Sequence, residues 1–260
     1  MVEPVTTGAV VAAGWTAQKL LGKTFDIVGD DLAKLYEKVR NKIFDNAAKK
    51  ISDINSDEQT NLRVTRDVLW NGSFADDPIC TEYFGGILAS SRSEEGKDDM
   101  GVFYLDVIKS LPSDHLRMHY IIYRSLNKLL IANDQKKSLN PGQENELNNE
   151  KLFFAFSQNF ENQFGNVDFV AILHGLIAKN IIGGFKVQNY ESEDKKLTFY
   201  YCEIAPKPLG VQLFAIANNQ FQNWRQFSLH DFEDFEGISL PEITSQTKED
   251  LVKKSSVLMA

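Results

Sequence analysis

The feature that most constrains the fold is an apolar helix that begins at Pro78 and contains two adjacent glycines. Asp77 can accept a backbone N–H as the N-cap, and proline suits the first helical position, where a missing N–H costs nothing. The large apolar residues at helical spacing are Ile79, Cys80, Tyr83, Phe84, Ile87 and Leu88. Gly85 and Gly86 lie on the other side, beside Glu82. Because glycine inside a helix costs roughly 1 kcal/mol relative to alanine, the pair predicts a packing notch that lets another helix come close or, alternatively, a groove for a ligand or partner.

Sequence motifs within this helix and on both sides of it carry a family resemblance. They are Gly-Ser-Phe-Ala-Asp-Asp-Pro at 72–78, Glu-Tyr at 82–83, Leu-Ala-Ser-Ser-Arg-Ser at 88–93, Gly-Lys-Asp-Asp at 96–99 and Leu-Arg-Met-His-Tyr at 116–120. Together they resemble the abortive infection alpha family of bacterial proteins. The resemblance implies a role in abortive phage defence, but it implies no catalytic residue and no cofactor.

The candidate binding residues belong to the stretch that carries this resemblance. They are Asp76, Asp77, Glu82, Gly85, Gly86, Ser91, Arg92, Asp98 and Arg117. Neither Ser91 nor Cys80 has a neighbouring base in the sequence that would activate it as a nucleophile. We therefore expect a non-catalytic effector or interaction protein, which binds a protein partner or a second copy of itself.

Two pairs of acidic residues support an alternative, a metal-dependent enzyme. Asp76-Asp77 and Asp98-Asp99 flank the apolar helix, and clustered carboxylates bind Mg²⁺ or act in acid–base catalysis. The pairs flank it at opposite ends, however, and a helix of about 14 residues is roughly 20 Å long. His115 and His119 have the spacing of two metal ligands, but the glutamate of a zincin motif is absent. Capping explains the acids, a hydrogen-bonded core position explains His119, and we expect no metal site.

Composition places the chain among ordinary globular proteins. Its 260 residues suffice for one large or two modest domains, and hydrophobic and charged fractions of 43% and 25% argue against global disorder. The formal net charge of −8 gives no general attraction to nucleic acid. Both cysteines, Cys80 and Cys202, fall in apolar segments, which indicates a reduced, cytoplasmic protein.

The first residues raise the question of membrane contact. Residues 8–21 are mostly apolar, but Gln18 and Lys19 interrupt them and a spanning helix needs about 20 apolar residues. No basic residue precedes the run, so we expect no signal peptide. The sequence predicts a buried helix or, alternatively, a segment that contacts the inner membrane from the cytoplasm. The candidate membrane-contacting residues are Val10, Val11, Trp15, Leu20 and Leu21.

The predicted fold class is mainly α, with a helical N-terminal and central region followed by a small α+β winged-helix-like domain. The five predicted segments are amphipathic helices at 1–55, a central helical domain at 56–131, a linker at 132–150, the α+β domain at 151–229 and a partly ordered tail at 230–260. In the central domain, Ser56 stands three residues before Gln59 and predicts a helix start. On the helix expected from Ser113, Arg117 and Arg124 fall on the polar side.

The α+β segment is similar in its order of elements to a winged-helix domain. An apolar helix ends at Gly183-Gly184, two strand-like runs follow at 185–190 and 197–204, and Pro208 opens another helix. Winged helices often bind DNA, so a DNA-binding regulator is a second alternative. The charged residues of the expected wing are Glu191, Glu193, Asp194, Lys195 and Lys196. This mixture of signs favours a protein partner over nucleic acid.

Overall fold

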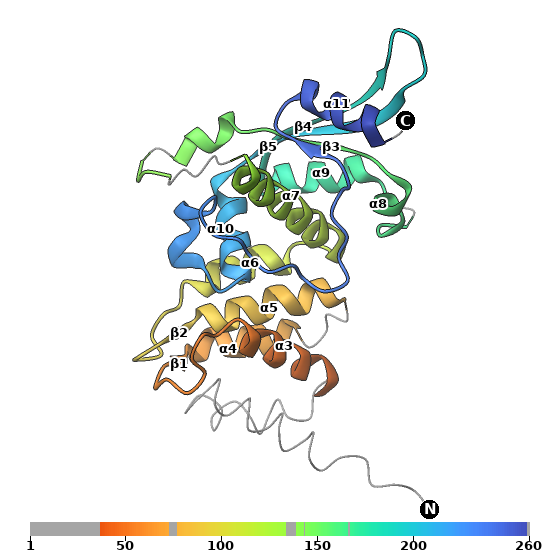
Figure 1. The fold of residues 1–260 in the computed structure, drawn as a ribbon. Coiled ribbons are helices and arrows are strands. Elements are labelled where there is room, and N and C mark those ends of the chain that lie inside the picture. Colours follow the sequence, from red (N-terminus) through yellow and green to blue (C-terminus); the bar gives the residue numbers. More distant parts are fainter. Residues whose placement is uncertain (1–36, 73–76, 134–138, 143, 166, 259–260) are drawn as a thin grey trace, which may run out of the picture. The chain divides into compact units, whose positions relative to one another are not determined.

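The computed structural model describes residues 37–72, 77–133, 139–142, 144–165 and 167–258 (Figure 1). These residues form a mixed α+β fold with a small antiparallel sheet. Backbone contacts divide the chain into a first unit, residues 1–113 and 216–221, and a second unit, residues 114–215 and 222–260. This division differs from the five predicted segments, because nearly all of the helix that begins at Ser113 belongs with the C-terminal sheet and not with the central helices.

Several predictions concern residues that the structure does not describe. Asp76, the candidate membrane-contacting residues and most of the amphipathic pattern before residue 37 lie outside the described residues. Within the described part of the chain, no helix combines the length and the apolar character needed to cross a membrane.

The first unit is built around the apolar helix predicted from Pro78. Its elements are α3 (Glu37–Lys49), β1 (Gln59–Thr60), α4 (Leu62–Gly72), α5 (Pro78–Ser90), β2 (Arg92–Ser93) and α6 (Gly101–Lys109). Helix α5 packs against α3, α4 and α6 (Figure 1). Every residue of α5 from Ile79 to Ala89 is buried except Glu82, so this helix is the core of the unit on all sides and not on one face alone.

The predicted helix start at Ser56 is wrong. Helix α4 begins at Leu62, because the Asn61 side chain accepts hydrogen bonds from the N–H groups of Arg63 at 2.9 Å and Val64 at 3.2 Å. This contact satisfies two of the N–H groups that a helix start leaves unpaired. The residues before it form the two-residue strand β1, which pairs with β2. Helix α4 ends at Gly72.

The second unit combines helices with the sheet. Its elements are α7 (Ser113–Ala132), the 3-10 helix η1 (Glu144–Asn149), β3 (Leu152–Ala155), α8 (Gln158–Asn162), α9 (Phe169–Ala178), β4 (Ile182–Glu191), β5 (Thr198–Pro206), α10 (Pro208–Ala217), the 3-10 helix η2 (Phe221–Gln226), β6 (Thr244–Ser245) and α11 (Lys248–Leu258). The last two residues of α10 and the first of η2 are assigned to the first unit. The strand order is β4-β5-β3-β6, and each neighbouring pair is antiparallel. The predicted hairpin of two strands is confirmed, whereas β3 and β6 were not predicted.

Helices cover both faces of this sheet (Figure 1). On one face, the buried residues Phe153 and Tyr201 belong to a cluster that includes Leu251 of α11. On the other face, the ring of Phe154 lies 5.3 Å from that of Phe160 in α8. Phe160 in turn stacks on Phe169 of α9 at 5.7 Å between ring centroids. The second unit therefore has a helix–sheet–helix core.

The C-terminal residues correct two predictions. Residues 230–260, expected to form a partly ordered tail, contain β6 and α11, and Leu251 is fully buried. Arg124, expected on the polar side of its helix, has a side chain that is only 4% exposed. Its guanidinium group lies 2.8 Å from Asp231 and 2.7 Å from Asp234. The acidic segment therefore attaches to α7 instead of extending into solvent.

Candidate functional site

The described acidic residues that suggested a metal site have structural roles: Asp77 caps α5, and the others bond to the turn before α6 or to Arg63. Asp77 accepts a hydrogen bond from the N–H of Ile79 at 3.0 Å, and Asp98 accepts one from Met100 at 3.0 Å. Asp99 lies 3.7 Å from the guanidinium group of Arg63. No group of three or more potential metal ligands occurs among the described residues. The capping interpretation of Asp77 is confirmed.

The two glycines of α5 form a packing notch. A Cβ atom on Gly85 would lie 2.9 Å from the Cβ of Asn46 in α3 and 3.0 Å from the backbone of Ala47. A Cβ atom on Gly86 would lie 2.0 Å from the carbonyl oxygen of Ala217. Beside them, Glu82 forms an ion pair with Lys50. The chain itself fills the space at these glycines, so the predicted notch is confirmed and the alternative ligand groove is not present there.

Ser91 bonds to the last turn of α5, and Arg92 holds the loop that precedes α4. The hydroxyl of Ser91 donates to the carbonyl of Leu88 at 2.8 Å. The Arg92 guanidinium group donates to the carbonyls of Ser56 at 3.4 Å and Glu58 at 3.1 Å. Both side chains are buried, and they organise the backbone instead of facing a ligand.

Arg117 belongs to the other unit. Its guanidinium group contacts Asp114 at 2.9 Å and donates to the carbonyl of Gln163 at 3.1 Å. The described candidate binding residues are therefore spread over two units, and each has a partner within its own unit. They do not form one site.

Two buried polar side chains of α7, His119 and Tyr123, form hydrogen bonds to other segments of the second unit. His119, fully buried, donates to the carbonyl of Gly210 at 2.9 Å, which requires the tautomer protonated on Nε2. Burial lowers the pKa of His119 to about 4, so the ring is neutral at physiological pH. The Tyr123 hydroxyl donates to the carbonyl of Ile181 at 2.5 Å and accepts from the N–H of Lys207 at 2.9 Å. The predicted core role of His119 is confirmed.

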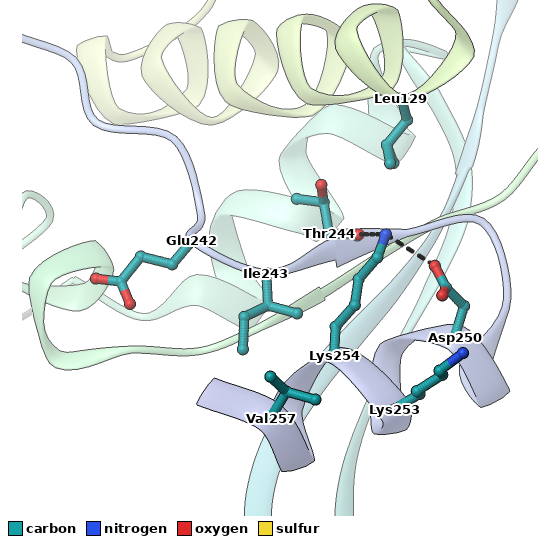
Figure 2. Close-up of a pocket in the computed structure, with 8 residues that line it drawn as sticks. All are labelled: Leu129, Glu242, Ile243, Thr244, Asp250, Lys253, Lys254 and Val257. Atoms are coloured by element: carbon teal, nitrogen blue, oxygen red, sulfur yellow. Dashed lines mark hydrogen bonds and ion pairs between the residues drawn. The ribbon is translucent and has the colours of Figure 1, made fainter. Parts of the chain in front are cut away.

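A groove in the second unit is the strongest remaining candidate for a binding site (Figure 2). It lies between α7, β6 and α11 and has a volume of about 580 Å³. The lining residues are Leu129, Glu242, Ile243, Thr244, Asp250, Lys253, Lys254 and Val257. Leu129 and Ile243 are 6% and 7% exposed, whereas Val257 is 77% exposed. The groove thus combines an apolar floor with a charged rim.

The two lysines of the groove differ in their surroundings. The Lys254 ammonium group lies 2.8 Å from Asp250 and donates to the carbonyl of Thr244 at 3.0 Å, which bridges α11 and β6 (Figure 2). Among the described residues, no carboxylate pairs with the ammonium group of Lys253. The described residues that line the groove include no histidine, cysteine or serine.

The sequence did not predict the groove, because α11, which forms one of its walls, falls in the segment expected to be a tail. One signal was present. Thr247 stands three residues before Asp250, and its hydroxyl accepts a hydrogen bond from the N–H of Asp250 at 3.2 Å. A threonine followed by an acid at this spacing, ahead of the apolar Leu251, is typical of a helix start.

The comparisons with known proteins identified no relative of this chain. No protein-family model matches the chain, and neither the curated proteins nor the solved structures contain a significant match.

Proposed function

We propose that this protein is a non-catalytic, protein-binding effector of bacterial antiphage defence, of the abortive infection type. The defence context comes from the resemblance of residues 72–120 to the abortive infection alpha family. The observation that supports a binding role is the groove between α7, β6 and α11, with its apolar floor and the ammonium group of Lys253, which pairs with no described carboxylate. A cytoplasmic location, with contact to the inner membrane through residues 8–21, belongs to the same proposal.

The chemistry of the groove suggests the kind of partner it takes. Leu129 and Ile243 provide an apolar floor, and Lys253 offers a positive charge at the rim. A protein segment that carries an apolar side chain next to a carboxylate complements both features. Such a segment gains apolar burial and one ion pair at the same time.

The enzyme alternative has less support. Asp77 caps α5, and Asp98 accepts the N–H of Met100 in the turn before α6. The Cys202 thiol is buried, which raises its pKa to about 12. A thiol with this pKa supplies almost no thiolate at neutral pH. The function is therefore better explained by contacts with a partner than by a reaction.

The DNA-binding alternative also has less support. The order α9, β4, β5 and α10 agrees with a winged-helix-like module, which we retain as a proposal for the fold. The lysines of the hairpin lie near acids: Lys186 is 3.6 Å from Glu203, and Lys196 is 3.3 Å from Asp194. Phosphate binding needs cations that are free to replace counterions.

A protection assay in cells with substituted groove residues tests the proposed function. Lys253→Glu and Val257→Asp are expected to reduce protection against phage. The first would repel the carboxylate of the partner segment, and the second would place a charge against its apolar side chain. Losing about 1.4 kcal/mol of binding free energy corresponds to about a tenfold weaker affinity. The measurement is the number of plaques on cells that carry each variant.

The matched controls separate binding from catalysis and from folding. Ser256→Glu adds an acid to an exposed position of α11 that does not line the groove, and it should keep full protection. Asp77→Asn and Asp98→Asn keep a side-chain oxygen that can accept the same backbone N–H but remove the carboxylate, and both variants should also keep full protection. Full protection by the groove variants would contradict the proposed binding site. Loss of protection in the asparagine variants, with unchanged melting temperature, would favour the enzyme.

A further inference from the structure

The long edge strand β4 is the basis of a further inference. In the order β4-β5-β3-β6, β5 is the one described strand that pairs with β4, which has ten residues against two in the opposite edge strand β6. Residues 186–189 are exposed. An unpaired edge of this length presents a row of backbone N–H and C=O groups, to which another extended backbone is complementary.

Hydrogen bonds beside the hairpin turn identify the backbone groups that face outward. The N–H of Ser192 donates to the carbonyl of Leu197 at 2.9 Å, so these residues form a hydrogen-bonded pair. Such pairs alternate with non-hydrogen-bonded pairs along an antiparallel ladder. The outward residues of β4 are therefore Phe185, Val187, Asn189 and Glu191. The N–H of Phe156 donates to the carbonyl of Tyr200, opposite Asn189, from the β3 side of β5, which agrees with this assignment.

The outward residues of β4 lack the usual protection of an edge strand. Residues 185–191, all of them described, contain no proline, and the irregularity in register is confined to Ile182 and Gly184. The one lysine of this part, Lys186, lies in a pair bonded to β5, and its ammonium group is 3.6 Å from Glu203. Edges are normally blocked by proline, by bulges or by lysines that project along the free side. The edge from Phe185 to Glu191 is regular and accessible.

We propose that β4 pairs with β4 of a second copy of the chain, antiparallel and about a twofold axis at Gln188. In this register Val187 lies opposite the partner's Asn189 and Phe185 lies opposite the partner's Glu191, so all four outward residues are paired. An axis at Val187 would place Glu191 opposite the irregular start of the strand.

A second copy fits this edge better than an unrelated strand for two reasons. One edge supplies both the donors and the acceptors that its symmetry mate needs. The antiparallel arrangement about Gln188 also pairs all four outward residues, whereas a parallel arrangement in register would align like charges. This inference concerns a surface away from the groove and does not depend on the proposed function.

Cysteine crosslinking of the full-length protein tests the register. At the twofold axis the Cα atoms of a non-hydrogen-bonded pair lie about 4.5 Å apart, within the range of a disulfide. Gln188→Cys should therefore form a covalent dimer under mild oxidation with oxidised glutathione. Lys186→Cys is a matched control on the same face of the strand, and its two copies would lie about 14 Å apart. The native Cys80 and Cys202 are buried, so they should contribute little. Equal crosslinking of both variants would overturn the register.

Sedimentation over a range of concentrations tests the pairing itself. The wild-type protein should show reversible dimerisation, and Val187→Pro should weaken it about tenfold or more, because proline removes an outward N–H that β5 does not use. Val187→Thr keeps the N–H and should dimerise like wild type. Asn189→Lys places a charge at the same edge and should act like Val187→Pro, which covers the case of a misfolded proline variant. A wild-type protein that stays monomeric at every concentration overturns the proposal.

Discussion

Gly86→Ala is expected to destabilise the first unit by about 3 kcal/mol, the upper range for overpacking a well-packed core. The added Cβ atom would lie 2.0 Å from the carbonyl oxygen of Ala217 and 2.3 Å from its carbonyl carbon. Both atoms belong to the backbone, so no side-chain rotation relieves the clash. An exposed helix shows the opposite sign, because alanine is favoured over glycine by roughly 1 kcal/mol there.

Chemical denaturation of wild-type and variant proteins measures this effect. Gly184→Ala is a suitable control, because nothing lies within 4 Å of the position that its Cβ atom would take. We expect the control to change the free energy of unfolding by less than about 1 kcal/mol. An increase in stability for Gly86→Ala would show that the notch between α5 and residues 216–221 is open, contrary to the structure.

The second large effect is a loss of stability in acid that depends on His119. The pKa of its imidazole is lowered to about 4 in the folded protein, against 6.5 for an ordinary histidine. Above pH 6.5 the ring is neutral in both the folded and the unfolded state, so its full contribution to the free energy of unfolding is present. As the pH falls from 6.5 through 4, the unfolded chain binds a proton that the folded chain does not, so stability decreases. The difference in pKa corresponds to a loss of about 3 kcal/mol below pH 4.

His119→Gln isolates this contribution from those of other titrating groups. The Gln amide nitrogen can reach the place of Nε2 and donate to the carbonyl of Gly210, but it does not titrate. The free energy of unfolding, measured against pH for both proteins, should fall more steeply for wild type between pH 6.5 and pH 4. Parallel curves would mean that His119 is already protonated, or that it is accessible to water, in the folded state.

The local parts of this fold could be predicted from the sequence. Asp77 followed by a proline, the adjacent glycines of α5 and the apolar neighbours of His119 each depend on residues close in the chain. Their structural roles follow from helix geometry and capping alone. The hairpin of β4 and β5 could be predicted for the same reason, since its two runs are separated by a short polar turn.

The remaining parts depend on contacts between distant residues. Arg124 is buried because it pairs with Asp231 and Asp234, which are 107 and 110 residues further along the chain. Strand β3 is a continuous apolar run of four residues, which periodicity alone cannot distinguish from part of a buried helix. The short strand β6 is defined by its pairing with β3 and has no pattern of its own.

The candidate site was less predictable than the fold. The acids and arginines of the family-resembling stretch attracted attention, yet those that the structure describes cap helices, form ion pairs or hold loops. The groove instead joins Leu129 of α7 to β6 and α11, more than 100 residues later in the chain. The helix start at Thr247 could be predicted from the sequence. The position of α11 across the groove from α7 could not, because it depends on the three-dimensional fold.

A phage challenge of cells that carry the gene tests the central claim, an effector of abortive infection, most directly. Culture growth is followed after infection with fewer phage than cells and, separately, with more phage than cells. An abortive effector should let the culture survive the first infection and should let it collapse in the second, because every infected cell dies before releasing phage. Collapse at both ratios across a broad phage panel would contradict a role in defence, and survival at both would contradict the abortive mode.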